Sequence, residues 1–120
     1  MNLKEQLHNY MQTDDNILFA YLFGSYADGT AQRESDVDVA IFFRHHTLDD
    51  KLSIIHTLQK IVHKEIDLVT LNEVKNLFLL ESILNDGILL KDHQERPWFE
   101  VRKEHEIKDF KHFLKYIDAA

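Results

Sequence analysis

The chain contains no cysteine, one proline and three glycines in 120 residues. Without cysteine it has no disulfide bond, thiolate nucleophile or cysteine metal ligand, which suits a reducing cytoplasm. With so little proline and glycine it has no long flexible linker, and its 44% hydrophobic residues favour a folded core. No apolar run approaches the roughly 18 residues of a membrane span, and the N-terminus lacks the apolar segment of a signal peptide. We therefore expect one soluble, cytoplasmic domain over residues 1–120.

Basic residues are also scarce. The chain carries 21 acidic residues against 14 lysines and arginines, a formal net charge of −7. A protein that binds nucleic acid broadly needs a basic face to neutralise phosphates, so we expect no direct nucleic-acid partner. The balance is compatible with a small nucleotide whose charge is offset by metal ions, or with a basic protein partner.

The apolar pattern predicts four strands and four helices. The run at residues 17–23 is apolar on both faces, which is typical of a strand covered by helices. Thr47 precedes two aspartates and predicts a helix start, and Thr70-Leu71-Asn72-Glu73 resembles a capping box that opens another helix. The expected elements are helix 2–13, strand 17–23, strand 37–43, helix 48–62, strand 66–71, helix 74–85, strand 88–90 and helix 97–117. This order, α-β-β-α-β-α-β-α, predicts an α+β fold, an α/β sandwich with a small mixed β-sheet and flanking helices.

Two of the helices carry apolar stripes that predict their buried faces. In the helix after Thr47 the stripe consists of Leu48, Leu52, Ile55, Leu58 and Val62. In the C-terminal helix it consists of Trp98, Val101, Ile107, Phe110, Phe113, Leu114 and Ile117. The second stripe favours packing on the domain's own sheet or helices. Because aromatic residues are enriched in interfaces, partner binding by the helix at about residues 97–117 is the alternative interpretation.

The main site signal lies between the first two strands. Asp36 and Asp38 head an otherwise apolar strand, and side chains at i and i+2 point to one face, with Cα atoms roughly 6–7 Å apart. Two carboxylates so placed repel each other unless a cation lies between them. Gly24-Ser25, after the preceding strand, offers backbone N–H groups and a hydroxyl that can bind phosphate. The pattern therefore predicts metal-assisted chemistry on a nucleotide.

This combination resembles the signature of the nucleotidyltransferase superfamily related to DNA polymerase β, in which Gly-Ser is followed after about ten residues by Asp-x-Asp. Here Gly24-Ser25 and Asp36-Val37-Asp38 show that spacing without a gap, and Gly29-Thr30-Ala31 also fits the pattern of small prokaryotic members. The chain's size resembles the minimal nucleotidyltransferases (MNT) that are paired with HEPN-domain proteins in toxin–antitoxin modules. The resemblance extends through about residue 91 and implies a nucleotidyltransferase fold.

The resemblance also implies a role for each matching residue. Asp36 and Asp38 would bind Mg²⁺. Asp67, on a neighbouring strand, matches the family's third carboxylate, which would ligate a second Mg²⁺ and help deprotonate the attacking hydroxyl. Gly24 would permit close backbone approach, and Ser25 would hydrogen-bond the phosphates of ATP. For Asp67 alone, a simple strand end is the competing interpretation.

The chain departs from the family pattern in its positive charge. Many small members carry basic residues at the positions of Asp28 and Gln32, where this chain has an acid and an amide. Arg33, one place later, is the nucleotide-binding cation that we expect here, together with metal or a partner's side chains. The eight histidines show no zinc-ligand spacing with a nearby acid, and Lys64 fits a solvated helix face.

By this resemblance the chain is an Mg²⁺-dependent nucleotidyltransferase that acts as an antitoxin. It would transfer AMP from ATP to a hydroxyl, a tyrosine, of a cognate HEPN ribonuclease toxin and so neutralise it, within a hetero-oligomer. One alternative is a non-catalytic antitoxin that neutralises the toxin by binding alone. Another is transfer to a small molecule such as an aminoglycoside, for which larger relatives use an additional helical domain that 120 residues do not provide.

Overall fold

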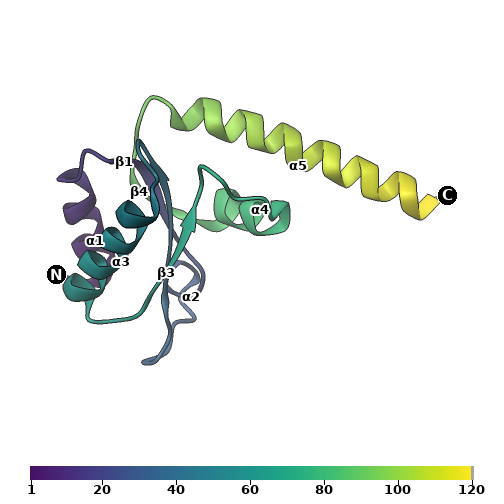
Figure 1. The fold of residues 1–120 in the computed structure, drawn as a ribbon. Coiled ribbons are helices and arrows are strands. Elements are labelled where there is room, and N and C mark those ends of the chain that lie inside the picture. Colours follow the sequence, from purple (N-terminus) through teal and green to yellow (C-terminus); the bar gives the residue numbers. More distant parts are fainter. Residues whose placement is uncertain (120) are drawn as a thin grey trace.

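A four-stranded mixed β-sheet lies at the centre of the molecule, in the strand order β3-β2-β1-β4. The computed structural model describes residues 1–119. β1 (Ile17–Phe23) pairs antiparallel with both β2 (Val37–Phe43) and β4 (Ile88–Lys91), whereas β3 (Ile66–Thr70) runs parallel to β2. The mixed sheet and its flanking helices confirm the predicted α+β fold (Figure 1).

Helices cover both faces of this sheet. α1 (Leu3–Gln12) and α3 (Leu48–Val62) lie against one face, and α4 (Leu77–Asp86) and the first half of α5 (Arg96–Ala119) cover the other (Figure 1). Alternation along β2 divides the core between the two faces. The side chains on the α1/α3 face are Val37, Val39, Ile41 and Phe43. Asp38 shares the opposite, α4/α5 face with Ala40, as expected from a period of two.

The caps of α1 and α3 explain where these helices begin. The Asn2 side chain accepts a hydrogen bond from the Glu5 N–H at 2.9 Å, and Thr47 forms a capping box with Asp50. Within α3 the predicted stripe is wrong at its start, because Leu48 and Leu52 are exposed, and it is confirmed at Leu58 and Val62, which are buried. The buried residues of α3 are Ile54, Leu58 and Val62. At 3.6 residues per turn, Leu48 and Leu52 lie about 80–120° around the helix from Leu58, outside its contact with α1 and the sheet.

The start of α4 also differs from the prediction. Instead of opening at the Thr70–Glu73 segment, the helix begins at Leu77, where the Asn76 side chain accepts a hydrogen bond from the Leu79 N–H at 3.1 Å. The Asn72 side chain is engaged elsewhere, since it accepts from the N–H of Phe43 and donates to its carbonyl, both at 2.8 Å. Asn72 thus binds the segment after β3 to the end of β2. Its side chain is therefore not available to cap a helix, and α4 begins only at Leu77.

The first half of α5 is fixed to the body by aromatic packing. Phe99 is 2% exposed, and its ring centroid lies 5.4 Å from the centroids of both Phe19 and Phe42. The Tyr21 hydroxyl donates a hydrogen bond to Glu100 in the next position of the helix. The predicted stripe is therefore wrong in the first turn of α5, since Phe99 enters the core and Trp98, about 100° away around the helix, is 69% exposed.

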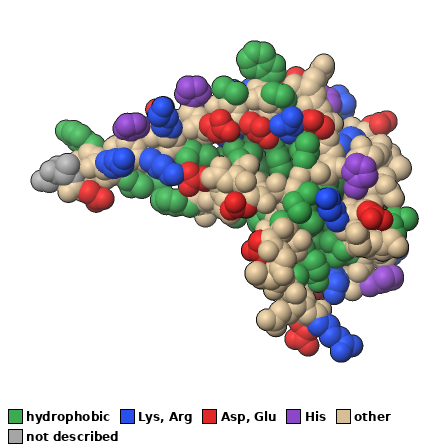
Figure 2. Space-filling model, turned by 180° about the vertical axis from the view of Figure 1, so that it is seen from behind, with side chains coloured by type: hydrophobic (Ala, Val, Ile, Leu, Met, Phe, Trp, Pro, Cys, Tyr) green, Lys and Arg blue, Asp and Glu red, His purple; other side chains and the backbone are tan. Residues whose placement is uncertain are grey.

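The second half of α5 extends away from the rest of the molecule (Figures 1 and 2). A helix of 24 residues is about 36 Å long, and the whole molecule measures 51 × 32 × 23 Å. α4, which supports α5 from below in Figure 1, has only 10 residues. None of the helices in residues 1–119 combines the length and hydrophobicity needed to cross a membrane.

Candidate active site

A turn at Gly24 joins β1 to the short helix α2 (Ser25–Asp28). Gly24 has φ 70° and ψ −152°, a conformation that glycine adopts far more readily than other residues. A Cβ atom at this position would lie 2.2 Å from Oδ2 of Asp38. The missing side chain therefore lets the backbone of this turn lie directly against the Asp38 carboxylate.

Three carboxylates meet beside this turn. Asp38 is paired with Phe23 across the antiparallel β1–β2 ladder and with Asp67 across the parallel β2–β3 ladder. Side chains of directly paired residues lie on the same face of a sheet, and Asp36, two residues before Asp38, points the same way. The structure thus brings together all three predicted carboxylates, one of which comes from a strand almost 30 positions later in the chain, as the residue numbers show.

The electrostatics of this cluster reflect its crowding. Partial burial raises the pKa of the Asp38 carboxyl above its ordinary value, and the negative charges of Asp67 and then Asp36 raise it further. At neutral pH the three carboxylates repel one another. A cation placed among them would relieve this repulsion.

The donor set fits a hard divalent cation such as Mg²⁺, which prefers oxygen ligands. Residues 1–119 contain no group of three or more histidine, aspartate or glutamate side chains that could hold a metal ion. Mg²⁺ does not require one, because it commonly takes one or two carboxylates and completes its coordination with water and substrate phosphates. Asp36, Asp38 and Asp67 are the residues that could supply those carboxylates.

The loop between α2 and β2 is shaped by Asp28. Its carboxylate accepts hydrogen bonds from the N–H and the hydroxyl of Thr30, at 2.9 and 2.6 Å, and these bonds lower the pKa of Asp28. Asp28, one of the two positions where we expected a base from the resemblance, therefore has a structural task in the turn. Gln32, the other departure, closes the same loop, since its N–H donates to the Ser35 hydroxyl at 2.8 Å.

A lysine that the sequence pattern assigned to a solvated helix face lies at this loop. Lys64 follows the end of α3, and its ammonium donates a hydrogen bond to the Arg33 carbonyl at 3.2 Å. The same ammonium lies 5.8 Å from the centre of the Tyr26 ring. Its place just before β3, the strand of Asp67, is the sequence signal that could have identified it. Arg33 itself is exposed in the loop.

A cleft of about 300 Å³ opens at the Gly24 turn, between α2 and α4, and of the predicted site residues only Gly24 lines it. Its lining residues are Phe23, Gly24, Ala27, Asp28, Ser82 and Asp86. The sequence pattern did not single out Ser82 and Asp86, which reach the site only because α4 packs over the end of β1. Since the lining includes two aspartates and no lysine or arginine, a polyphosphate in this cleft would need its charge offset by cations from elsewhere.

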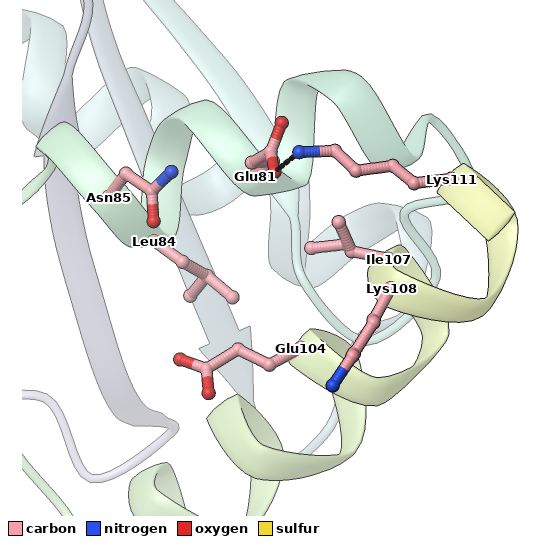
Figure 3. Close-up of a pocket in the computed structure, with 7 residues that line it drawn as sticks. All are labelled: Glu81, Leu84, Asn85, Glu104, Ile107, Lys108 and Lys111. Carbon is pink, nitrogen blue, oxygen red and sulfur yellow. Dashed lines mark hydrogen bonds and ion pairs between the residues drawn. The ribbon is translucent and has the colours of Figure 1, made fainter. Parts of the chain in front are cut away.

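A second pocket, of about 220 Å³, lies between α4 and α5 (Figure 3). Leu84 and Ile107 contribute its apolar lining, and an ion pair between Glu81 and Lys111 joins the two helices at one end. None of the predicted site residues lines this pocket. We therefore place the candidate active site at the carboxylate cluster and not here.

Comparison with known proteins gives this arrangement a family. Residues 5–96 match the family described as "Polymerase beta, Nucleotidyltransferase". The chain belongs to this nucleotidyltransferase family. The matched range contains the Gly24 turn and all three carboxylates of the nucleotidyltransferase domain, and it ends at Arg96, the first residue of α5.

Two relatives of this nucleotidyltransferase have been named for an activity. A protein of Methanocaldococcus jannaschii, named as a candidate protein adenylyltransferase, is 36% identical over 70 residues, which are 56% of this chain and 70% of the relative. Protein adenylyltransferase MntA of Shewanella oneidensis is 30% identical over 84 residues, which are 68% of this chain and 60% of the relative.

Solved structures share the nucleotidyltransferase fold. A chain from a toxin–antitoxin crystal structure with AMP-PNP matches with a TM-score of 0.80 at 21% identity, over 97% of this chain and 95% of its own. A chain from tri-AMPylated Shewanella oneidensis HEPN toxin in complex with MNT antitoxin matches with a TM-score of 0.73 at 18% identity, over 97% and 96%. A structure described as a minimal nucleotidyltransferase, provisionally named, matches with a TM-score of 0.59 at 24% identity, over 73% and 95%.

Proposed function

We propose that this nucleotidyltransferase is an antitoxin that transfers AMP from ATP to a hydroxyl, a tyrosine side chain, of a cognate HEPN-domain ribonuclease toxin and thereby neutralises it. The observation that carries the proposal is the convergence of Asp36, Asp38 and Asp67 beside the Gly24 turn. Three carboxylates beside a glycine turn that also borders a cleft of about 300 Å³ suit nucleotidyl transfer.

The relatives support the choice of a protein acceptor. MntA of Shewanella oneidensis is named a protein adenylyltransferase, and one structural neighbour is described as containing a tri-AMPylated HEPN toxin.

In the proposed reaction the acceptor's hydroxyl oxygen bonds to the α-phosphorus of ATP, the bond from that phosphorus to the β-bridging oxygen breaks, and pyrophosphate leaves. Asp67, which is exposed at the sheet edge, takes the hydroxyl proton. Gly24 and Ser25 bind the phosphates through their backbone and hydroxyl groups, and Arg33 supplies positive charge from the loop. Lys64 adds a second cation there.

Asp36 and Asp38 would hold one Mg²⁺, and Asp67 would contribute to a second. When bound, these ions neutralise the triphosphate and activate both the attacking and the leaving oxygen. Because the cleft lining contains two aspartates and no lysine or arginine, the ions would add to Arg33 and Lys64 in offsetting the charge of the triphosphate.

The proposal is tested by incubating the purified chain with labelled ATP, Mg²⁺ and the HEPN protein encoded beside it. Intact mass of the partner should increase in steps of one AMP unit, and chelation of Mg²⁺ should prevent this. The matched control is the double variant Asp36→Asn/Asp38→Asn, which keeps the shape of both side chains and should transfer nothing.

Two results would argue against the enzymatic proposal. An unmodified partner in the presence of the folded chain would refute it. If the double variant protects cells from the toxin as well as the unsubstituted chain does, neutralisation by binding alone is the correct interpretation.

A further inference from the structure

The free half of α5 carries an apolar strip with helical spacing. Phe110, Phe113, Leu114 and Ile117 stand at positions i, i+3, i+4 and i+7, so they share one face of the helix. Phe113 is 57% exposed and Ile117 is 50% exposed. Hydrophobic side chains are visible toward the free end of α5 in Figure 2. This spacing is the one by which an amphipathic helix inserts into a groove of another protein.

The strip continues onto α4. Phe78, in the first turn of α4, is 59% exposed, and its ring packs edge-on against Phe110 with 5.5 Å between the centroids. The Glu81–Lys111 ion pair holds α5 to α4 next to this contact (Figure 3). The four-residue strip and Phe78, which we call the tip surface, therefore form one continuous apolar area across two helices.

The tip surface is held by a rigid support. The first half of α5 is fixed by buried Phe99 and by the Tyr21–Glu100 hydrogen bond, so the direction of the helix is set by the core. The same stripe of α5 that packs on the body at Ile107 becomes uncovered where α5 passes Leu77, the first residue of α4. A pre-set helix loses little conformational entropy on binding, which favours its use in recognition.

α5 is an addition to the nucleotidyltransferase domain. The family match ends at residue 96. The minimal nucleotidyltransferase structure aligns over 95% of its own length but covers only 73% of this chain. Chains from toxin–antitoxin structures cover 97–99% of this chain. The aligned part therefore includes the 24-residue helix α5. The fold with α5 is thus shared with chains from toxin–antitoxin structures.

We propose that the tip surface, formed by Phe78, Phe110, Phe113, Leu114 and Ile117, is where this chain docks its HEPN-domain partner, by inserting the end of α5 into an apolar groove of that protein. This inference rests on the proposed function for the identity of the partner. Lys115, one turn after the ion-paired Lys111, follows one edge of the strip, so the groove is expected to carry a carboxylate at the matching rim. The docking surface is separate from the carboxylate cluster, and affinity and chemistry are therefore separable by mutation.

The test compares two variants of the same helix. Phe113→Glu/Ile117→Glu places charges in the tip surface without touching the core, since both side chains are exposed. Trp98→Glu is the control, because Trp98 is a 69% exposed aromatic residue in the first turn of α5, away from the tip surface. We expect the double variant to weaken binding to the HEPN protein encoded beside this chain by at least about 30-fold in calorimetry, and the control to bind as the unsubstituted chain does.

Two further measurements keep the test decisive. Binding of a fluorescent ATP analogue should be unchanged in both variants, which shows an intact nucleotide site. Sedimentation of the chain alone should give a monomer; a dimer that the double variant dissolves would overturn the proposal in favour of a second copy on this surface. Unchanged affinity of the double variant for the partner would also overturn it. Loss of binding without any AMP transfer by the unsubstituted chain would refute the enzymatic function and leave the docking surface in place.

Discussion

Replacing Gly24 by alanine tests the site through a single methyl group. The added Cβ would lie 2.2 Å from Oδ2 of Asp38, well inside van der Waals contact, so the carboxylate has to move. Asp38 lies between Gly24 and Asp67. Moving its carboxylate away from Gly24 therefore also changes its position relative to the carboxylates of Asp67 and Asp36. We expect Gly24→Ala to abolish AMP transfer.

The cost in stability can be worked out from the backbone. A non-glycine residue at φ 70° and ψ −152° costs about 1–3 kcal/mol. For a domain of this length each kcal/mol corresponds to a melting temperature about 3–6 °C lower. The variant should therefore still fold at room temperature, and its loss of activity will greatly exceed its loss of stability.

Gly29 offers a matched control for backbone strain. It also has a positive φ, of 83°, but a Cβ there would find no atom within 4 Å. Gly29→Ala should lose about 1 kcal/mol of unfolding free energy through the left-handed conformation alone and keep AMP transfer. The comparison thus separates strain from displacement of Asp38.

The assay pairs urea unfolding with transfer of labelled AMP to the HEPN partner, at a temperature where both variants are folded. Activity of Gly24→Ala equal to that of Gly29→Ala would refute the reasoning, because it would mean that contact between the turn and Asp38 is not needed. A Gly24→Ala protein that fails to fold at all would contradict the estimated magnitude.

Three other variants test the electrostatics and the packing. The pKa of Asp38 is raised in the folded protein, so the repulsion that destabilises the fold is present above that pKa and is lost as pH falls through it. Without divalent cations, Asp38→Asn should raise the free energy of unfolding at neutral pH, by less than about 1 kcal/mol because the site is partly solvated, and the gain should shrink in acid. Phe99→Ala should cost about 3–5 kcal/mol in urea unfolding, because its ring is buried between two others, whereas Trp98→Ala should stay within about 0.5 kcal/mol. Equal effects of the two substitutions would contradict the orientation of α5.

Much of the local structure follows from neighbouring residues alone. The bounds of β1 and β2 agree with the predicted strands at 17–23 and 37–43, because an apolar run between polar turns leaves few alternatives. The start of α4 could not be predicted in this way. Its first capping signal, near Asn72, is used to bind the backbone of Phe43, a residue brought close only by folding.

The orientation of α5 shows the same limit. Trp98 and Phe99 are both aromatic and adjacent, so periodicity does not decide which one is buried. Phe99 is the buried one because its ring packs against those of Phe19 and Phe42 in the folded protein. Trp98, the preceding residue of the helix, then points to solvent. The exposure of Phe113 and Ile117 follows from the shortness of α4, a property of the packing and not of the helix itself.

The sequence by itself predicted the chemistry that we propose for this protein, because Gly24-Ser25 and Asp36-x-Asp38 are local patterns whose alternation and spacing place their groups on one face. Tertiary structure alone decided three other matters. It placed Asp67 beside Asp38 through a parallel register, brought α4 over the cleft, and left the end of α5 uncovered. Each depends on contacts between residues far apart in the chain, and such contacts are set by the whole core.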